Sequence, residues 1–141
     1  MPEAAVNYLA VLVTALITMV IGFVWYSPML FGKQWSELMG FSVNSPEDLK
    51  NMRQKAKPAY AVSFIGALLM SYVLAHFVDY AGSTTFAEGL QTGFWIWIGF
   101  VATTGLTNNM FSGKPLKLYM INYGYHLVTM AIAGGMLAIW T

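Results

Sequence analysis

Four stretches of the sequence are almost continuously apolar, and each is long enough to cross a bilayer as a helix. They cover residues 4–26, 59–78, 90–107 and 118–140. A span needs about 20 residues, because each helical residue advances about 1.5 Å through roughly 30 Å of hydrocarbon. These stretches lack the period-two alternation that a transmembrane barrel requires. The pattern therefore predicts an all-α integral membrane protein with four spans.

The connections between the stretches indicate how the helices are arranged. Ser27-Pro28 should end the first helix, because proline disfavours the helical conformation of the residue before it. The connections at 81–88 and 108–117 are short, so the helices on either side of each should be antiparallel neighbours. We expect a four-helix bundle built from two antiparallel helical hairpins.

A short amphipathic helix is predicted at residues 45–57, between the first two spans. Ser45 is suited to an N-cap, and Pro46 to the first helical turn. Pro58 is expected to mark the join to the second span. The apolar stripe of this helix would rest on the membrane surface. Its basic side chains would contact lipid headgroups, and these are Lys50, Arg53, Lys55 and Lys57.

Composition supports a membrane protein and excludes several other classes. Of the 141 residues 57% are hydrophobic and only 9% are charged, whereas soluble domains carry roughly 25% charged residues. The formal net charge of +1 is too small to indicate nucleic-acid binding. The sequence contains no cysteine, which excludes disulfides, thiolate metal sites and cysteine nucleophiles.

The distribution of basic residues predicts the orientation in the membrane. Lysine and arginine occur only in the first and third connections, as Lys33, Lys50, Arg53, Lys55, Lys57, Lys114 and Lys117. Basic residues accumulate in cytoplasmic loops. These two connections should therefore be cytoplasmic, with Met1, the 79–88 loop and Thr141 outside, an N-out and C-out arrangement.

Small residues recur at four-residue spacing in all four spans, and they form the clearest stripes in the first two. The stripes contain Ala10, Thr14, Thr18 and Gly22 in the first span, Ser63, Ala67, Ser71 and Ala75 in the second, and Gly135 in the fourth. Small residues let helix backbones approach closely in lipid. One interpretation is packing within a single chain. The other is self-association into a homo-oligomer, because four spans enclose little interior.

One group of polar side chains is expected inside the hydrocarbon. His126 lies roughly 13 Å along the fourth span from Lys117. Asn122 and Thr129 share its helix face, and Thr103, Thr107 and Asn108 of the third span are expected at a comparable depth. One hypothesis is a neutral histidine that hydrogen-bonds a neighbour and thereby fixes helix packing. The other is a proton or ligand site.

Candidate catalytic and metal sites are weak. His76 and Asp79 lie one turn apart with Tyr80 beside them, but two ligands without a third favour a solvated helix end. No catalytic triad, phosphate loop or metalloprotease motif occurs. We therefore expect no enzyme activity, no metal and no cofactor.

Several motifs resemble those of a known family. These are Trp25-Tyr26-Ser27-Pro28, Phe31-Gly32-Lys33, Trp35, Asn109, Pro115 and Tyr125-His126-Leu127. They resemble an uncharacterised family of small prokaryotic membrane proteins, catalogued as a domain of unknown function. The resemblance covers nearly the whole chain, and it implies four spans and a prokaryotic cytoplasmic membrane. It transfers no catalytic or binding residue.

Two functions follow from these patterns. The leading hypothesis is a multi-pass membrane protein, homo-oligomeric, that binds or passes a small solute or ion along a polar path through Asn122 and His126. The alternative is a structural or accessory membrane subunit that packs with lipids or with a partner membrane protein.

Overall fold

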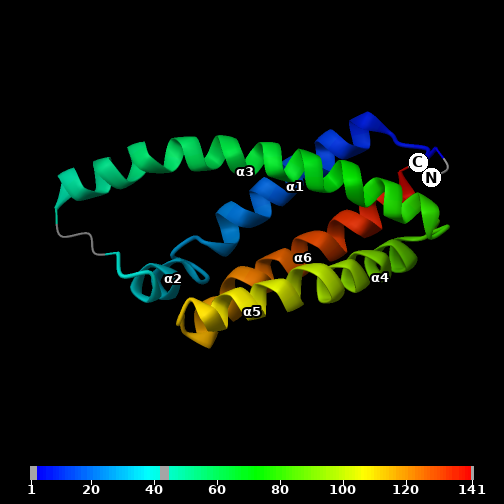
Figure 1. Ribbon diagram of the computed structural model, residues 1–141. Coiled ribbons are helices and arrows are strands. Elements are labelled where there is room, and N and C mark those ends of the chain that lie inside the picture. Colours follow the sequence, from blue (N-terminus) through cyan, green and yellow to red (C-terminus); the bar gives the residue numbers. More distant parts are fainter. Residues whose placement is uncertain (1–2, 42–44, 141) are drawn as a thin grey trace.

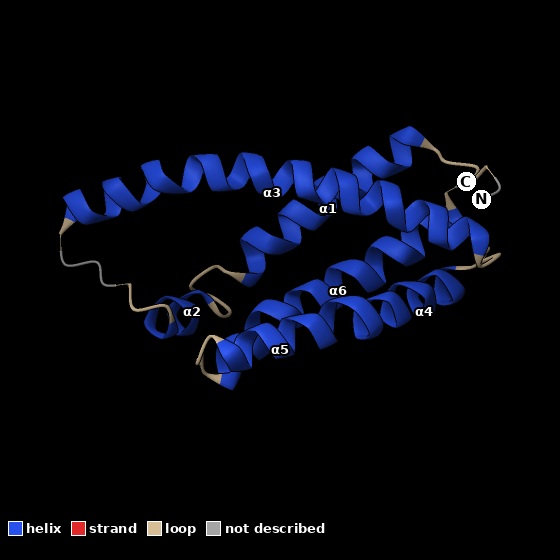
Figure 2. Ribbon diagram, in the orientation of Figure 1, coloured by secondary structure: helices blue, strands red, loops and turns tan. Residues whose placement is uncertain are grey.

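The computed structural model describes residues 3–41 and 45–140. In this part of the chain every regular element is helical (Figure 2), so the predicted all-α class is confirmed there. The charge pattern predicts Met1 and Thr141 on the non-cytoplasmic side of the membrane, but neither is among the described residues. In chain order the elements are α1 (Tyr8–Trp25), α2 (Gly32–Leu38), α3 (Pro46–Tyr80), α4 (Phe86–Ile96), the π-helical segment η1 (Trp97–Ala102), α5 (Thr103–Phe111) and α6 (Leu116–Ile139).

α1 begins where a polar side chain satisfies its first free amides. The Asn7 carboxamide oxygen accepts hydrogen bonds from the backbone amides of Leu9 and Ala10, at 3.1 and 3.2 Å. This cap explains why the helix starts at Tyr8 and not at the beginning of the apolar stretch. The helix ends at Trp25, before Ser27-Pro28, as the turn signal predicted.

The segment after α1 contains α2, a short helix that the hydrophobic pattern did not predict. At its start the Gly32 amide donates to the Ser27 carbonyl at 2.9 Å. A Cβ at this position would lie 2.7 Å from that carbonyl group, so only glycine allows the chain to fold back so closely. The fold-back places the Phe31 ring against Trp25, with ring centroids 4.8 Å apart.

The elements predicted at 45–57 and 59–78 form one continuous helix, α3. Its start is as predicted, because the Ser45 hydroxyl accepts from the Asp48 amide at 3.2 Å and Pro46 occupies the first turn. The predicted join at Pro58 is wrong, since the helix continues through it to Tyr80. An internal proline removes one helical hydrogen bond, but strong helix formers flank it here. The basic segment is therefore a continuation of the apolar helix.

The third predicted span, 90–107, lies within a longer helical path made of α4, η1 and α5. A capping box starts this path: the Thr85 hydroxyl accepts from the Glu88 amide at 3.2 Å. In return, the Glu88 carboxylate accepts from the amides of Thr84 and Thr85 at 2.8 and 3.1 Å. The fourth predicted span, 118–140, corresponds to α6, which starts after Pro115.

The closest packing is between α4 and α6, and glycines make it. A Cβ built on Gly89 would overlap the carbonyl oxygen of Gly134, and one on Gly93 would overlap that of Met130. The two backbones are therefore in direct contact. α1 packs against both α3 and α6. Figure 1 shows α3 and α1 on one side of the molecule and α6 with the α4–α5 path on the other.

The small-residue stripes are used mainly inside the bundle. Those buried are Ala10, Thr14, Thr18, Ala67, Ser71, Ala75 and Gly135. Gly22 is half-buried beside the Tyr125 hydroxyl, whereas Ser63 is exposed. Intramolecular packing therefore accounts for most of these positions, and self-association would need another surface.

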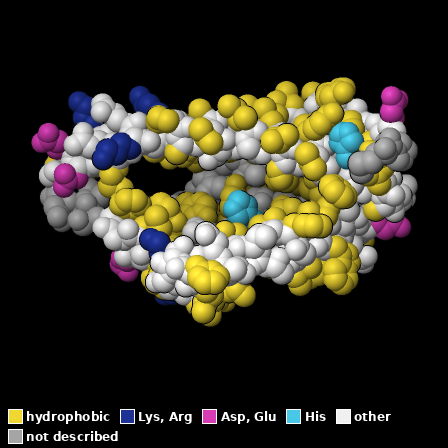
Figure 3. All heavy atoms as spheres, viewed as in Figure 1, with side chains coloured by type: hydrophobic (Ala, Val, Ile, Leu, Met, Phe, Trp, Pro, Cys, Tyr) yellow, Lys and Arg dark blue, Asp and Glu magenta, His cyan; other side chains and the backbone are white. Residues whose placement is uncertain are grey.

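Two helices in the described residues are long and apolar enough to cross a membrane, namely α1 and α3. Only 28% of the apolar window of each is buried, so most of the apolar surface of both helices is exposed. On the face drawn in Figure 3 hydrophobic side chains cover α3 from its middle to its C-terminal end, and basic and acidic side chains lie around the end where α3 begins. The arrangement fits a helical membrane protein.

Candidate functional site

The exit of α1 is fastened to α6 by two aromatic side chains. The Trp25 indole N–H donates to the Ile121 carbonyl at 2.9 Å, and the Tyr26 hydroxyl donates to the Asn122 carboxamide oxygen at 2.9 Å. Each ring thus buries its apolar body and places its polar atom on a partner. The carboxamide oxygen of Asn122, one of the predicted site residues, therefore takes part in the packing of α1 against α6.

Tyr125 makes the next contact between the same two helices. Its hydroxyl donates to the Thr18 carbonyl at 3.1 Å. Its ring lies edge-on to that of Tyr26, with centroids 5.5 Å apart. The Tyr26 ring is in turn 5.6 Å from that of Trp35 in α2. The aromatic residues of the sequence motif around Tyr26 therefore form one connected cluster, and this cluster packs α1, α2 and α6 against one another.

His126 follows this cluster on α6 but takes no part in its hydrogen bonds. Its ring lies 5.7 Å from that of Tyr123 and 5.2 Å from that of Tyr125, centroid to centroid. The side chain is exposed, and its ring nitrogens make no hydrogen bond to any described residue. In Figure 3 the surface is hollowed between α3 and the helices below it.

Thr129 is buried one turn beyond His126. Its hydroxyl donates to the backbone carbonyls of Tyr125 and His126, at 3.0 and 3.1 Å. The hydroxyl is thus satisfied by its own helix and offers no hydrogen to a solute. Within the predicted group on α6, the His126 imidazole and the Asn122 N–H donors therefore remain without a hydrogen-bond partner among the described residues.

The three predicted residues of the third span lie apart from those of α6. Thr103, Thr107 and Asn108 are exposed on α5, where they line a groove of about 460 Å³ together with Thr104 and Phe111. Across the described residues no hydrogen bond connects this groove to Asn122, His126 or Thr129. The sequence predicted one polar cluster, and the structure places its members at two separate sites.

The π-helical segment is the feature that the sequence did not reveal. Hydroxyl groups bond the backbone carbonyls of this segment: Thr103 donates to Gly99 at 2.8 Å, Thr104 donates to Phe100, and Tyr119 donates to Ala102 at 2.7 Å. Threonines next to a helical irregularity re-satisfy freed backbone groups. Gly99 followed by Thr103 and Thr104 was the available signal, but it is also common in regular helices.

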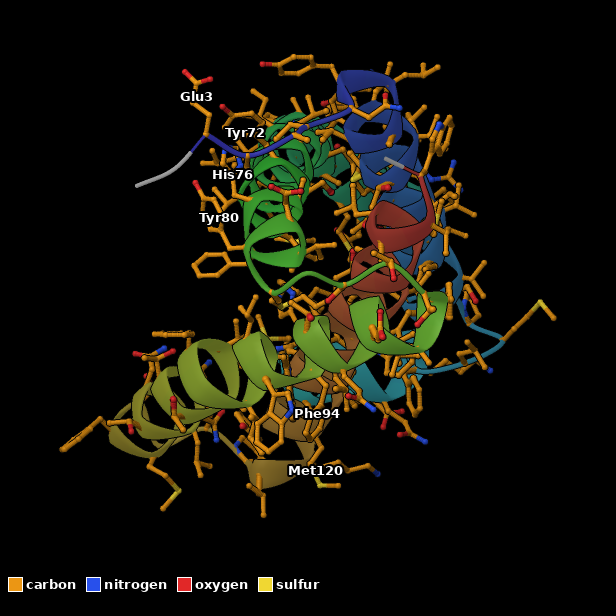
Figure 4. The ribbon with its side chains drawn as sticks, turned by 90° about the vertical axis from the view of Figure 1, so that its right-hand side faces the viewer. Glu3, Tyr72, His76, Tyr80, Phe94 and Met120 are labelled. Carbon is orange, nitrogen blue, oxygen red and sulfur yellow. The ribbon has the colours of Figure 1, made fainter. Side chains whose placement is uncertain are left out.

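At the opposite end, His76 and Asp79 make separate contacts. The His76 Nδ1–H donates to the Tyr72 carbonyl at 2.8 Å, while the Asp79 carboxylate accepts from the Ala5 amide at 3.2 Å. Figure 4 shows Tyr72, His76 and Tyr80 on the same side of α3. The described residues contain no group of three or more metal-ligating side chains. This region is therefore the C-terminal end of α3, to which the segment before α1 is hydrogen-bonded.

A known protein family matches most of the chain. A family model described as "Protein of unknown function (DUF1761)" matches residues 9–138. No curated protein and no solved structure matches the chain. The matched range includes the Trp25 and Tyr26 exit of α1 and its contacts on α6, so the resemblance to an uncharacterised family is confirmed. The chain belongs to the DUF1761 family, whose function is unknown.

Proposed function

We propose that this protein crosses a prokaryotic cytoplasmic membrane four times, through α1, the apolar half of α3, the α4–η1–α5 path and α6. α6 has 24 residues, which is about 36 Å of helix and enough for one crossing. The α4–η1–α5 path is of similar length. The exposed apolar side chains of α1 and α3 support burial in lipid, because water would not favour such a surface.

The distribution of basic residues supports an N-out, C-out orientation. The cysteine-free sequence allows a direct test with single cysteines. In intact cells, Ala81→Cys should react with a membrane-impermeant maleimide, whereas Ser112→Cys should react only after lysis. The reverse labelling pattern would contradict the orientation.

Within this membrane bundle we propose that His126 binds a small solute or ion, or passes a proton. The observation that carries the proposal is an exposed imidazole without a hydrogen-bond partner among the described residues. It lies about 15 Å along α6 from Leu116, near the depth of the bilayer centre. Histidine changes charge near neutral pH, and a polar group at that depth is costly without a functional partner. We propose no enzymatic role.

Proton flux into vesicles tests this function. Purified protein is reconstituted with a pH-sensitive dye inside, and an imposed potassium diffusion potential drives proton movement. We expect flux from the unmodified protein and from His76→Gln, the matched control at the other histidine. His126→Gln should lower the rate at least tenfold.

Equal flux from His126→Gln and the unmodified protein would exclude the proton role. Absence of flux from the unmodified protein, together with co-purification of one fixed membrane partner, would favour the accessory-subunit alternative. Both variants should first show the thermal midpoint of the unmodified protein, so that a folding defect is not read as a functional one.

A further inference from the structure

The groove on α5 is a polar surface in a helix that we assign to the membrane. Four of its lining residues, Thr103, Thr104, Thr107 and Asn108, are polar, and each is exposed. Among the described helices α5 packs mainly on η1 and α6. If the third span is in lipid, as proposed above, this surface faces hydrocarbon, which cannot hydrogen-bond it.

The polar side chains of the groove lie at other positions of the third span than those that contact α6. Gly89, Gly93 and Gly105 lie against α6, and the Trp97 indole N–H donates to the Tyr123 carbonyl at 3.0 Å. Asn109 is buried and its carboxamide donates to the Lys114 carbonyl at 3.2 Å, whereas the neighbouring Asn108 is exposed. The groove is therefore on the part of α5 that α6 leaves uncovered.

The hydrogen-bonding capacity of the groove is unbalanced within one chain. Thr103 and Thr107 donate their hydroxyl hydrogens to carbonyls of their own helix, at 2.8 and 3.1 Å, and Thr104 does the same. The three oxygens therefore remain as acceptors only. Asn108 supplies two N–H donors and one acceptor, and its carboxamide makes no hydrogen bond to a described residue.

A surface with this composition is complementary to itself. Across a twofold axis normal to the membrane, the two Asn108 carboxamides can each donate to the other, since each is both donor and acceptor. The second N–H of each then faces threonine oxygens that only accept. An apolar helix or a lipid chain would leave all of these groups unpaired. We propose that α5 binds a second copy of this chain through the groove formed by Thr103, Thr104, Thr107 and Asn108.

Cysteine crosslinking in membranes tests this interface, because the chain has no cysteine of its own. Thr104→Cys and Thr107→Cys should form disulfide-linked dimers under a mild oxidant. Leu69→Cys, which is 62% exposed but lies on α3, is the control and should remain monomeric. Equal crosslinking of all three, or of none, would overturn the proposed interface.

A second pair of variants tests the role of the carboxamide. In vesicles at fixed lipid dilution, Asn108→Leu should lower energy transfer between labelled copies at least fivefold, whereas Asn108→Gln should preserve it. An unchanged signal from Asn108→Leu would exclude the twofold carboxamide pair. Because Asn108 is exposed, both variants should keep the thermal midpoint of the unmodified chain.

The outcomes separate this inference from the proposed function on which it rests. Monomeric protein that still shows His126-dependent flux would remove the interface and leave the function. Protein that is released from membranes by alkaline carbonate would instead contradict the membrane assignment, and with it both proposals.

Discussion

Individual residues at the exit of α1 show how a polar atom in an apolar bundle acquires a structural role. Asn122 is at a depth where an amide suggests a ligand site, yet its oxygen accepts the Tyr26 hydroxyl. An interhelical hydrogen bond of this kind contributes about 1 kcal/mol in a membrane. The same helix exposes His126, which makes no such bond to the described residues. Neighbouring polar residues on one helix therefore differ in role according to what lies opposite them.

Glu88 provides a prediction at this scale, because its pKa is lowered. The cause is hydrogen bonding to the carboxylate, first from the backbone amide of Thr84 and then from that of Thr85. A lowered pKa in the folded state means that the cap contributes stability above the ordinary glutamate pKa of about 4.3. This contribution is lost as the pH falls through the folded-state value.

We therefore expect the start of α4 to open in acid. Hydrogen exchange of the Thr84 and Thr85 amides, corrected for the intrinsic rate, should accelerate when the pH falls from 7 to about 3. Glu88→Gln, which keeps a weaker acceptor but cannot titrate, should show fast exchange at both pH values. Protection that is independent of pH in the unmodified protein would exclude the carboxylate as the source of the cap.

Among the elements, α3 departs most from its predicted form. Its 35 residues correspond to about 52 Å of helix, which exceeds the hydrocarbon thickness by roughly 20 Å. If α3 crosses the membrane as proposed, a helix of this length, continuous through Pro58, carries its basic segment away from the membrane instead of laying it on the surface. Lys57 and Lys55 then lie nearest the headgroups, and Lys50 lies about 10 Å farther along the axis.

This geometry predicts unequal contributions of the basic residues to lipid preference. Each charge close to an anionic surface contributes about 1 kcal/mol, and the effect decays within a Debye length. Replacing Lys55 and Lys57 by glutamine should reduce enrichment of anionic spin-labelled lipid more than replacing Lys50 and Arg53. The difference should disappear at 1 M salt. Equal losses from the two double variants would favour a helix that lies flat on the membrane.

At the scale of the whole molecule, the glycine contact between α4 and α6 decides how closely the third and fourth predicted spans approach each other. Gly89 faces the Gly134 backbone, so a side chain there must push the helices apart. Gly66 of α3 has no atom within 4 Å of the corresponding Cβ position. The two glycines thus form a matched pair for measuring what close approach contributes.

We expect Gly89→Ala to destabilise the bundle by about 1–3 kcal/mol, the usual cost of overpacking. Gly66→Ala should be neutral or stabilising by up to about 1 kcal/mol, because it lowers the conformational entropy of the unfolded chain. Thermal melting in detergent, followed by circular dichroism, measures both changes. Similar midpoints for the two variants would show that the α4–α6 contact can relax without cost.

The apolar stretches, the cap at Ser45 and the turn at Ser27-Pro28 were sufficient to predict an all-helical chain and the approximate positions of most of its long helices, because these signals are local. Thr103, Thr107 and Asn108 could not be placed correctly, since the sequence does not specify which positions of the third span contact α6. The sequence also did not show whether a helix ends or continues at Pro58, because a proline can end a helix or lie within one.

The sequence by itself therefore determined the helical class, the approximate limits of the helices and the asymmetry of charge. These depend on the chemistry of residues within a few turns of one another. The tertiary structure alone decided which polar groups are satisfied: Asn122 by Tyr26, Tyr125 by the Thr18 carbonyl, and His126 by no described residue. Such pairing depends on atoms brought together from distant parts of the chain, which no local pattern specifies.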